Sequence, residues 1–270
     1  MTTLGKRLAV SAVLVSLTIY TIFFAPHWFF FLIIETFGLL GLSEFFAMAE
    51  KKDVEINRVL GLFCGGLIPI SVYFAWEPVI IVAACLCLFI FNFSRRKVEN
   101  PLITTSVTVF GIIYVTWFFS HLLKLREMPH GAALVFYSIL LVKGGDAGAY
   151  FVGRKFGRVK LIEHISPNKS VEGAWGCLAT TVLLSLLSKI YLPHLPLFHL
   201  FILGLILGVV SQLGDLGESL LKRDAGVKDS GTIPGLGGIL DVLDSLLLTV
   251  PVIYYYIAGF VEHGLAHAIS

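Results

Sequence analysis

The sequence predicts an all-α integral membrane protein, a polytopic helical bundle of about nine transmembrane helices with a cytoplasmic N-terminus. Of its 270 residues, 57% are hydrophobic and only 14% are charged, which is more apolar surface than a soluble domain of this length can bury. The charges are also clustered, because long stretches contain no Asp, Glu, Lys or Arg. Several of these stretches approach or exceed the ~20 residues needed to cross the hydrocarbon core of a bilayer.

Nine apolar stretches mark the expected spans. They are residues 8–25, 28–48, 59–75, 78–94, 102–123, 131–152, 173–190, 198–219 and 238–260. A Pro26-His27 break separates the first two, because proline disrupts a helix interior. The first stretch follows Lys6 and Arg7, as a signal peptide would, but no small-x-small cleavage site with a polar region comes after it. We therefore expect it to be retained as a span.

The placement of basic residues predicts the orientation. With nine spans, Lys143 lies within a span, and among the other Lys and Arg residues only Lys124, Arg126 and Lys189 fall on the poorer side of the membrane. The positive-inside rule makes the richer side cytoplasmic, so the C-terminal tail lies outside. We expect a multi-pass protein of the cell inner (cytoplasmic) membrane with its active site facing the cytoplasm.

The two halves of the chain differ in polar content. Residues 1–125 form the expected scaffold of N-terminal transmembrane helices, in which Glu44 is interpreted as a helix-end carboxylate at the interface and Glu35 as facing a neighbouring helix. Residues 126–270 are expected to carry the catalytic site in their cytoplasmic loops and helix ends. Three polar clusters fall there on the cytoplasmic side, at residues 143–176, 211–235 and 234–260.

Helical spacing places polar side chains of the later clusters on single helix faces. Those of the eighth span are Gln212, Asp215, Ser219 and Lys222, and those of the ninth are Asp241, Asp244 and Ser245. Polar faces on apolar membrane helices point to the bundle interior or to a water-filled cavity. With Asp146 of the sixth span they suggest an oxygen-rich site for Mg²⁺, which proteins hold with one or two carboxylates plus substrate phosphates.

The loops beside these carboxylates have phosphate-binding character, because they combine Lys and Arg with glycine-rich backbone. Their basic residues are Arg154, Lys155, Lys169, Lys222, Arg223 and Lys228. A structural alternative stays open, in which Asp215 pairs with Lys222 or Lys143 and the aspartates of the ninth span cap its helix. A cap accounts for one carboxylate and leaves the convergence of several clusters unexplained.

Residues 219–245, SLLKRDAGVKDSGTIPGLGGILDVLDS, follow the pattern Ser-x-x-Lys-Arg, four residues, Lys-Asp, Pro-Gly-His-Gly-Gly, Asp-Arg-x-Asp-Ser. Upstream, GAYFVGRKFG, ISPNKSVEGAWG and GDLGES match Ala-Tyr-Phe-x-Gly-Arg, Ser-Pro-x-Lys-[Ser/Thr]-x-Glu-Gly and Gly-Asp-Leu-x-Glu-Ser. Over about residues 140–250 the chain thus resembles the phosphatidate cytidylyltransferases (CDP-diacylglycerol synthases). The resemblance implies transfer of the cytidylyl group of CTP to phosphatidic acid, with release of pyrophosphate, for phospholipid biosynthesis.

The resemblance also implies site residues, cofactors and partners. The implied catalytic residues are Asp215, Lys222, Arg223, Lys228, Asp229, Asp241 and Asp244. The implied substrate-binding residues are Asp146, Arg154, Lys169, Ser170, Glu172, Ser219, Gly237 and Gly238. Asp215, Asp241 and Asp244 are the implied metal ligands for Mg²⁺, with a monovalent cation such as K⁺ beside it. CTP, phosphatidic acid, membrane lipids and a second copy in a homodimer are the implied partners, and nucleic acid is not among them.

This sequence departs from the family pattern at two central positions. Leu236 stands where the family has His, and Val242 where it has Arg between the two aspartates. The second change removes a positive charge beside two carboxylates. The carboxylates implied as metal ligands and the Lys and Arg residues of the loop remain, so we expect an active enzyme. A different lipid acceptor or an impaired activity stays open.

Two other functions remain possible on the sequence alone. One is CTP-dependent transfer to another lipid phosphate, ether-linked or polyprenyl, because an apolar groove for lipid tails leaves no motif. The other is a secondary transporter, which nine spans with intramembrane charges would suit. Against transport, the charges gather at the cytoplasmic ends, and no corresponding halves are apparent.

Overall fold

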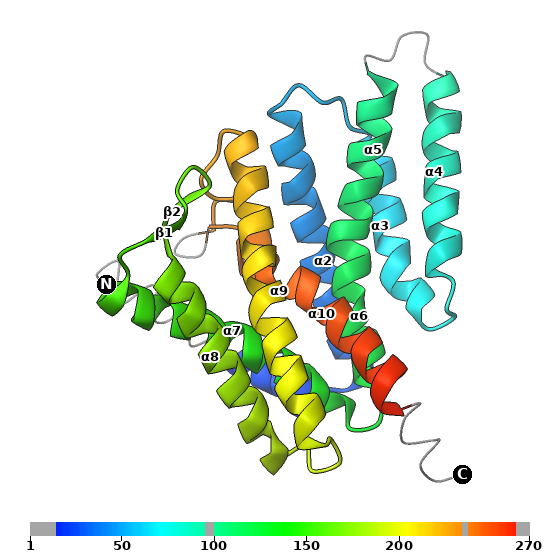
Figure 1. The fold of residues 1–270 in the computed structure, drawn as a ribbon. Coiled ribbons are helices and arrows are strands. Elements are labelled where there is room, and N and C mark those ends of the chain that lie inside the picture. Colours follow the sequence, from blue (N-terminus) through cyan, green and yellow to red (C-terminus); the bar gives the residue numbers. More distant parts are fainter. Residues whose placement is uncertain (1–14, 95–99, 234–236, 263–270) are drawn as a thin grey trace. The chain divides into compact units, whose positions relative to one another are not determined.

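The computed structural model describes residues 15–94, 100–233 and 237–262, and most of them lie in helices (Figure 1). The chain divides into two compact units. The first takes in Met1–Lys124 and Leu221–Leu243, and the second takes in Leu125–Leu220 and Asp244–Ser270. Residues 221–243, from the end of one helix to the start of the next, therefore belong to the same unit as the N-terminal helices.

The first unit is built from the N-terminal helices. They are α2 (His27–Glu50), α3 (Arg58–Val72), α4 (Glu77–Ser94), α5 (Pro101–Gly111), the π-helical segment η1 (Ile112–Trp117) and most of α6 (Phe118–Glu127). Helix α3 packs against α2, α4 and η1. The helices of this unit are thus held together by contacts between neighbours in sequence and by η1.

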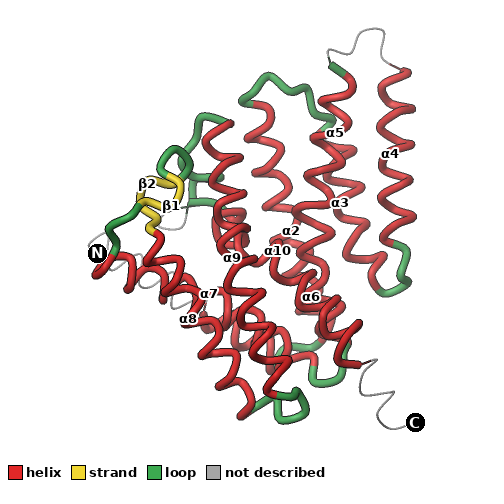
Figure 2. Tube along the Cα trace, viewed as in Figure 1, coloured by secondary structure: helices red, strands yellow, loops and turns green. Residues whose placement is uncertain are grey.

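The second unit is built from long helices and a small hairpin. Its elements are α7 (Gly131–Phe156), β1 (Lys160–Ile162), β2 (Ser166–Ser170), α8 (Val171–Leu187), η2 (Ser188–Ile190), most of α9 (Leu197–Asp224), most of α10 (Ile239–Tyr256) and η3 (Ile257–Glu262). Helices α7 and α8 pack extensively against each other. Strands β1 and β2, yellow in Figure 2, pair with each other. The pairing is antiparallel, with Lys160 opposite Ser170. The sequence predicts this segment only as a glycine-rich basic loop.

The all-α membrane fold is confirmed. Within the described residues, seven helices are long and apolar enough to cross a membrane. They are His27–Glu50, Glu77–Ser94, Pro101–Glu127, Gly131–Phe156, Val171–Ile190, Leu197–Asp224 and Ile239–Phe260. The predicted span 59–75 corresponds to α3, a shorter apolar helix of 15 residues. The predicted span 8–25 lies partly outside the described residues, so the count of nine stays a prediction.

Helix starts follow local sequence signals. Pro26 precedes α2 with φ −66°, so the predicted Pro26-His27 break is the N-terminal boundary of this helix. Asn57 caps α3, its side-chain oxygen accepting the N–H of Leu60 at 3.1 Å. Ser170 caps α8 in the same way, accepting the N–H of Gly173 at 3.1 Å. Such caps satisfy N–H groups that have no partner within the helix.

Glycines bring neighbouring helices close together. In the first unit, a Cβ on Gly61 of α3 would lie 2.6 Å from the ring of Phe46 in α2. In the second unit, a Cβ on Gly145 of α7 would lie 2.8 Å from Thr181 of α8, and one on Gly204 of α9 would lie 2.8 Å from Val182. Small residues at helix contacts are the usual means of packing helices in a bilayer, where hydrophobic burial gives little drive.

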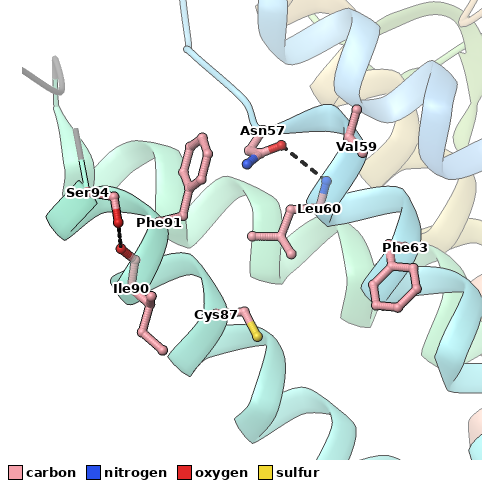
Figure 3. A pocket seen from close by; sticks show the side chains of 8 residues that line it. All are labelled: Asn57, Val59, Leu60, Phe63, Cys87, Ile90, Phe91 and Ser94. Carbon is pink, nitrogen blue, oxygen red and sulfur yellow. Dashed lines mark hydrogen bonds between the residues drawn. The ribbon is translucent and has the colours of Figure 1, made fainter.

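Helices α3 and α4 border an apolar groove of about 520 Å³. Figure 3 shows its lining residues, which are Asn57, Val59, Leu60, Phe63, Cys87, Ile90, Phe91 and Ser94. Two of its polar atoms are engaged locally, since Asn57 Oδ1 accepts from Leu60 N–H and Ser94 Oγ donates to the Ile90 carbonyl. The groove therefore offers apolar surface, as suits a wall that faces lipid.

A buried ion pair joins α4 to α6. The Glu77 carboxylate pairs with Lys124 Nζ, and the two side chains are only 2% and 18% exposed. Because removing one partner of a buried pair strands the other charge, at a cost of about 3–5 kcal/mol, Glu77→Gln is expected to lower the apparent melting temperature of the purified protein in detergent. Glu50→Gln is the control, since Glu50 pairs with Arg58 at the surface. Equal melting of Glu77→Gln and the unsubstituted protein would contradict the role of this pair.

Candidate active site

Asp241, in the first turn of α10, has its carboxylate surrounded by donors from its own unit. Lys222 Nζ, near the end of α9, donates to Oδ1. Oδ2 accepts from the N–H of Ser230 at 2.8 Å, from Ser230 Oγ at 2.9 Å and from the N–H of Gly238 at 2.8 Å. The Lys222 and Asp241 side chains are only 11% and 13% exposed. This carboxylate therefore holds the loop between α9 and α10 and neutralises the lysine.

Glu44 of α2 supplies a second carboxylate to the same loop. Its Oε1 accepts the N–H of Ile239 at 2.9 Å, and its Oε2 accepts the N–H of Leu240 and the hydroxyl of Ser230, each at 2.8 Å. The first N–H groups of α10, which have no partner within the helix, are thus capped from another helix. We call Glu44, Lys222, Ser230 and Asp241 the capping cluster.

Sequence reasoning missed this role of Glu44, because it places the residue at the membrane interface. The one available signal was a carboxylate within an apolar helix, which needs a partner to offset its cost. No sequence pattern connects it to Ser230, which lies 186 positions further along the chain.

The glycines of the signature loop have distinct structural reasons. Gly237 has φ +88°, a left-handed conformation that side chains rarely adopt. It closes a tight loop, since its N–H and carbonyl both bond to Ile233, at 3.1 and 2.6 Å. Gly238 lies against the capping cluster, where a Cβ would contact Ser230 Oγ and Glu44 Oε2. The departure at Leu236 falls outside the described residues.

The second unit gathers three aspartates and two lysines. Lys169 Nζ lies 2.6 Å from Asp215 Oδ2, and Lys143 Nζ lies 3.5 Å from Asp146 Oδ2. Asp244 of α10 interacts electrostatically with Asp215, Lys143 and Asp146. We call Lys143, Asp146, Lys169, Asp215 and Asp244 the carboxylate cluster. Its three acidic and two basic groups come from four separate elements, α7, β2, α9 and α10.

These contacts decide between the pairings that the sequence leaves open. Asp215 pairs with Lys169 of the β-hairpin, and Lys222 pairs with Asp241. Asp241 does take part in fixing the start of α10, by accepting the Gly238 N–H, while Asp244 interacts electrostatically with other charges of the second unit. The two aspartates are thus held by different partners despite their spacing of three residues.

The remaining predicted residues come from α7, β2, α8, α9 and the loop after α9. Ser170 is the N-cap of α8, and Glu172 accepts the N–H groups of Arg158 at 3.0 Å and Val159 at 3.3 Å. Arg154 is exposed and donates to the Tyr150 hydroxyl at 2.9 Å. Arg223 is exposed and donates to the Val227 carbonyl at 3.2 Å. Lys228 and Asp229 are exposed, and Ser219 is half-buried.

The donor set for a metal ion favours some of the predicted ligands over others. Among the described residues, no group of three or more His, Cys, Asp or Glu side chains is arranged to hold a metal ion. Mg²⁺ needs fewer, since one or two carboxylates plus substrate phosphates suffice. Asp215 and Asp244 interact with each other and offer such oxygens. Asp241 has both oxygens engaged by protein donors, so it fits this task less well.

Comparison with known proteins gives consistent results. A model described as the cytidylyltransferase family matches residues 5–260. The chain is 33% identical over 243 residues to a phosphatidate cytidylyltransferase of Bacillus subtilis, covering 86% of this chain and 89% of that protein. It is 31% identical over 283 residues to one of Synechocystis, covering 92% and 94%. With one of Haemophilus influenzae it shares 29% identity over 285 residues, covering 94% and 98%.

Proposed function

Because the chain belongs to the cytidylyltransferase family, we propose that it transfers the cytidylyl group of CTP to phosphatidic acid, giving CDP-diacylglycerol and pyrophosphate. The observation that carries the proposal is the carboxylate cluster, which joins Asp215 and Asp244 to Lys143 and Lys169 within an apolar helical unit. Paired intramembrane charges of this kind mark functional sites. A site in the membrane suits a reaction between one lipid and one soluble substrate.

The reaction requires positioning and charge neutralisation more than acid–base chemistry. An oxygen of the phosphatidic acid phosphate attacks the α-phosphorus of CTP, and the bond from that phosphorus to the bridging oxygen of the β-phosphate breaks. The electron pair of this bond leaves with pyrophosphate. The attacking group is already an oxyanion, so no serine or histidine nucleophile is needed. The enzyme has to hold two polyanions together and offset their charge.

Each unit, taken by itself, contains basic side chains whose charge suits phosphate groups. In the second unit, Lys169 Nζ is buried beside Asp215, so its positive charge lies within the carboxylate cluster. In the first, Lys222 is neutralised by Asp241 and orders the loop that carries Lys228. Mg²⁺ held by Asp215 and Asp244 would add charge neutralisation as pyrophosphate leaves.

The proposal includes the orientation of the protein in the membrane and its oligomeric state. We infer that the basic loops lie in the cytoplasm and that the protein resides in the inner membrane, since nearly all Lys and Arg residues fall on one side of the predicted spans. CTP then reaches the site from the cytoplasm, and phosphatidic acid reaches it from the bilayer. A homodimer is inferred from the resemblance to the family alone.

A purified-protein assay tests the proposal. The protein is incubated in detergent micelles with labelled CTP, phosphatidic acid and Mg²⁺, and the expected product is CDP-diacylglycerol, formed together with pyrophosphate. Parallel reactions contain ether-linked phosphatidic acid or polyprenyl phosphate, and one contains no lipid acceptor. If product forms with only one of the alternative lipids, that lipid is the acceptor and phosphatidic acid is not. No CDP-lipid from any acceptor would contradict the enzyme function.

The departure at Val242 gives a testable expectation. Restoring the family residue in Val242→Arg is expected to change turnover by less than about threefold, because Lys222 already neutralises Asp241. Steady-state rates at saturating CTP measure the effect, and Val242→Met controls for side-chain size. A gain of about tenfold or more in Val242→Arg alone would mean instead that the enzyme is impaired by the loss of this arginine.

A further inference from the structure

We propose that Glu44 is a positioning residue of this enzyme, which acts on the reaction through the loop between α9 and α10. The inference rests on the proposed function for its kinetic consequences. Glu44 lies in α2, in the half of the chain whose expected role is that of a scaffold. Its carboxylate nevertheless accepts three hydrogen bonds from the segment that carries the family signature.

The contact fixes the direction in which α10 begins. The N–H groups of Ile239 and Leu240 point at separate oxygens of one carboxylate, at 2.9 and 2.8 Å. Because a carboxylate is planar and accepts on both oxygens, this arrangement sets the position and the tilt of the first turn. Negative charge at a helix N-terminus is also electrostatically favourable. The position of Asp241 in that turn depends on the same contact.

Ser230 connects Glu44 to the signature lysine. Its hydroxyl lies 2.8 Å from Glu44 Oε2 and 2.9 Å from Asp241 Oδ2. One hydroxyl carries one proton, so the two carboxylates share this donor. Asp241 in turn binds Lys222 Nζ. A continuous set of hydrogen bonds therefore runs from α2 through Ser230 and Asp241 to Lys222.

The backbone around Glu44 is shaped to this carboxylate. A Cβ on Gly231 would lie 3.0 Å from Glu44 Cδ, and a Cβ on Gly238 would contact Glu44 Oε2. Only glycine leaves the loop backbone this close to the carboxylate. The fit is tight enough that a side chain of different shape or hydrogen-bonding character has to displace the loop.

Glu44→Gln is the test because it keeps the size of the side chain. A glutamine has one acceptor oxygen, and its amide group would face the N–H of Ile239 or Leu240, donor against donor. We expect kcat to fall by about 10–100-fold, since misplacement of catalytic groups by ~1 Å has effects of this size. The Kd for CTP is expected to change by less than about threefold, because Glu44 binds backbone and Ser230 rather than phosphate.

The binding measurement separates positioning from loss of folded protein. CTP titration gives both Kd and the fraction of molecules that bind, so turnover is expressed per binding-competent molecule. Glu50→Gln, the same change at the exposed end of α2, is the matched control and is expected to retain full turnover. Glu44→Gln with turnover within about twofold of the unsubstituted enzyme would overturn the proposal. So would a loss of turnover fully explained by fewer molecules that bind CTP.

Ser230→Ala tests whether Glu44 acts through the hydrogen bonds from Ser230 to Asp241 and Lys222. If Glu44 acts through Ser230, the double variant Glu44→Gln with Ser230→Ala loses less than the product of the two single losses, because coupled residues are not additive. Full additivity of the two losses would overturn the route from Glu44 through Ser230.

Hydrogen exchange at residues 238–241 needs no turnover and is expected to speed up in Glu44→Gln. If no CDP-lipid forms with the unsubstituted protein, the proposed function fails, while this exchange result still decides whether Glu44 holds the loop.

Discussion

Asp244→Asn is expected to lower turnover by about 100-fold or more while leaving the protein folded. Asp244 interacts electrostatically with Asp215, Asp146 and Lys143, so it belongs to the set of charges that the proposed reaction uses to bring two polyanions together. Asparagine keeps the shape and removes the charge, and loss of one preorganised electrostatic group in an active site typically costs about 10²–10³ in kcat. Initial rates with CTP and phosphatidic acid measure the loss.

Asp224→Asn is the matched control for Asp244→Asn. Asp224 is an exposed carboxylate at the end of α9 whose partner is Lys52, at 3.4 Å, and its side chain is 68% exposed. A surface pair of this kind contributes about 0–1 kcal/mol, so this variant is expected to keep its turnover and its melting temperature. Normal turnover in Asp244→Asn would remove Asp244 from the site, and equal losses in both variants would show a nonspecific effect.

Gly238→Ala is expected to have the second large effect, a loss of turnover of about 100-fold together with a lower melting temperature. The added Cβ would contact Ser230 Oγ and Glu44 Oε2 and lie 2.5 Å from the N–H nitrogen of Gly231. The backbone nitrogen cannot rotate away as a flexible side chain can, so the loop or the start of α10 has to move. Overpacking of this kind costs about 1–3 kcal/mol. Rates and thermal unfolding in detergent measure the two effects.

Gly217→Ala is the control for Gly238→Ala. Within the described residues, a Cβ on Gly217 of α9 meets no atom within 4 Å. Alanine is the better helix former by about 1 kcal/mol, so this variant is expected to keep its turnover and to melt no lower than the unsubstituted protein. If Gly238→Ala keeps its turnover and melting temperature as Gly217→Ala does, the loop accommodates a Cβ at position 238, and the expectation is wrong.

The membrane helices could be predicted because the bilayer imposes one simple requirement. An apolar run of sufficient length has to be helical, since no water satisfies its backbone. The long predicted spans from residue 28 onward therefore agree with the structure, and Pro26 marks a true boundary. The hairpin β1–β2 was missed because it lies outside any such run. Its short, polar strands carry no hydrophobic alternation that would indicate a sheet.

The site could be predicted in its residue types and less well in its pairings. Helical spacing and the signature motifs identify Asp215, Lys222 and Asp241 from the sequence alone. The partners depend on tertiary contacts that local spacing does not encode. Lys169 reaches Asp215 from a different element, and Glu44 reaches Ser230 from a different half of the chain. The assignment of Asp241 as a metal ligand stays a prediction, and its oxygens are engaged by protein donors.

The capping of α10 by Glu44 also has a consequence for biogenesis. Glu44 precedes Ser230 by 186 positions, and at about 5–20 residues per second synthesis of that interval takes about 10–40 s. During this time α2 has been made, and its carboxylate lacks the three donors that bind it in the finished protein. The first turn of α10 therefore receives its cap from a helix that was made well before it. The contact between Glu44 and the loop before α10 is consequently a late event in assembly, because it cannot form until residues 230–240 have been synthesised.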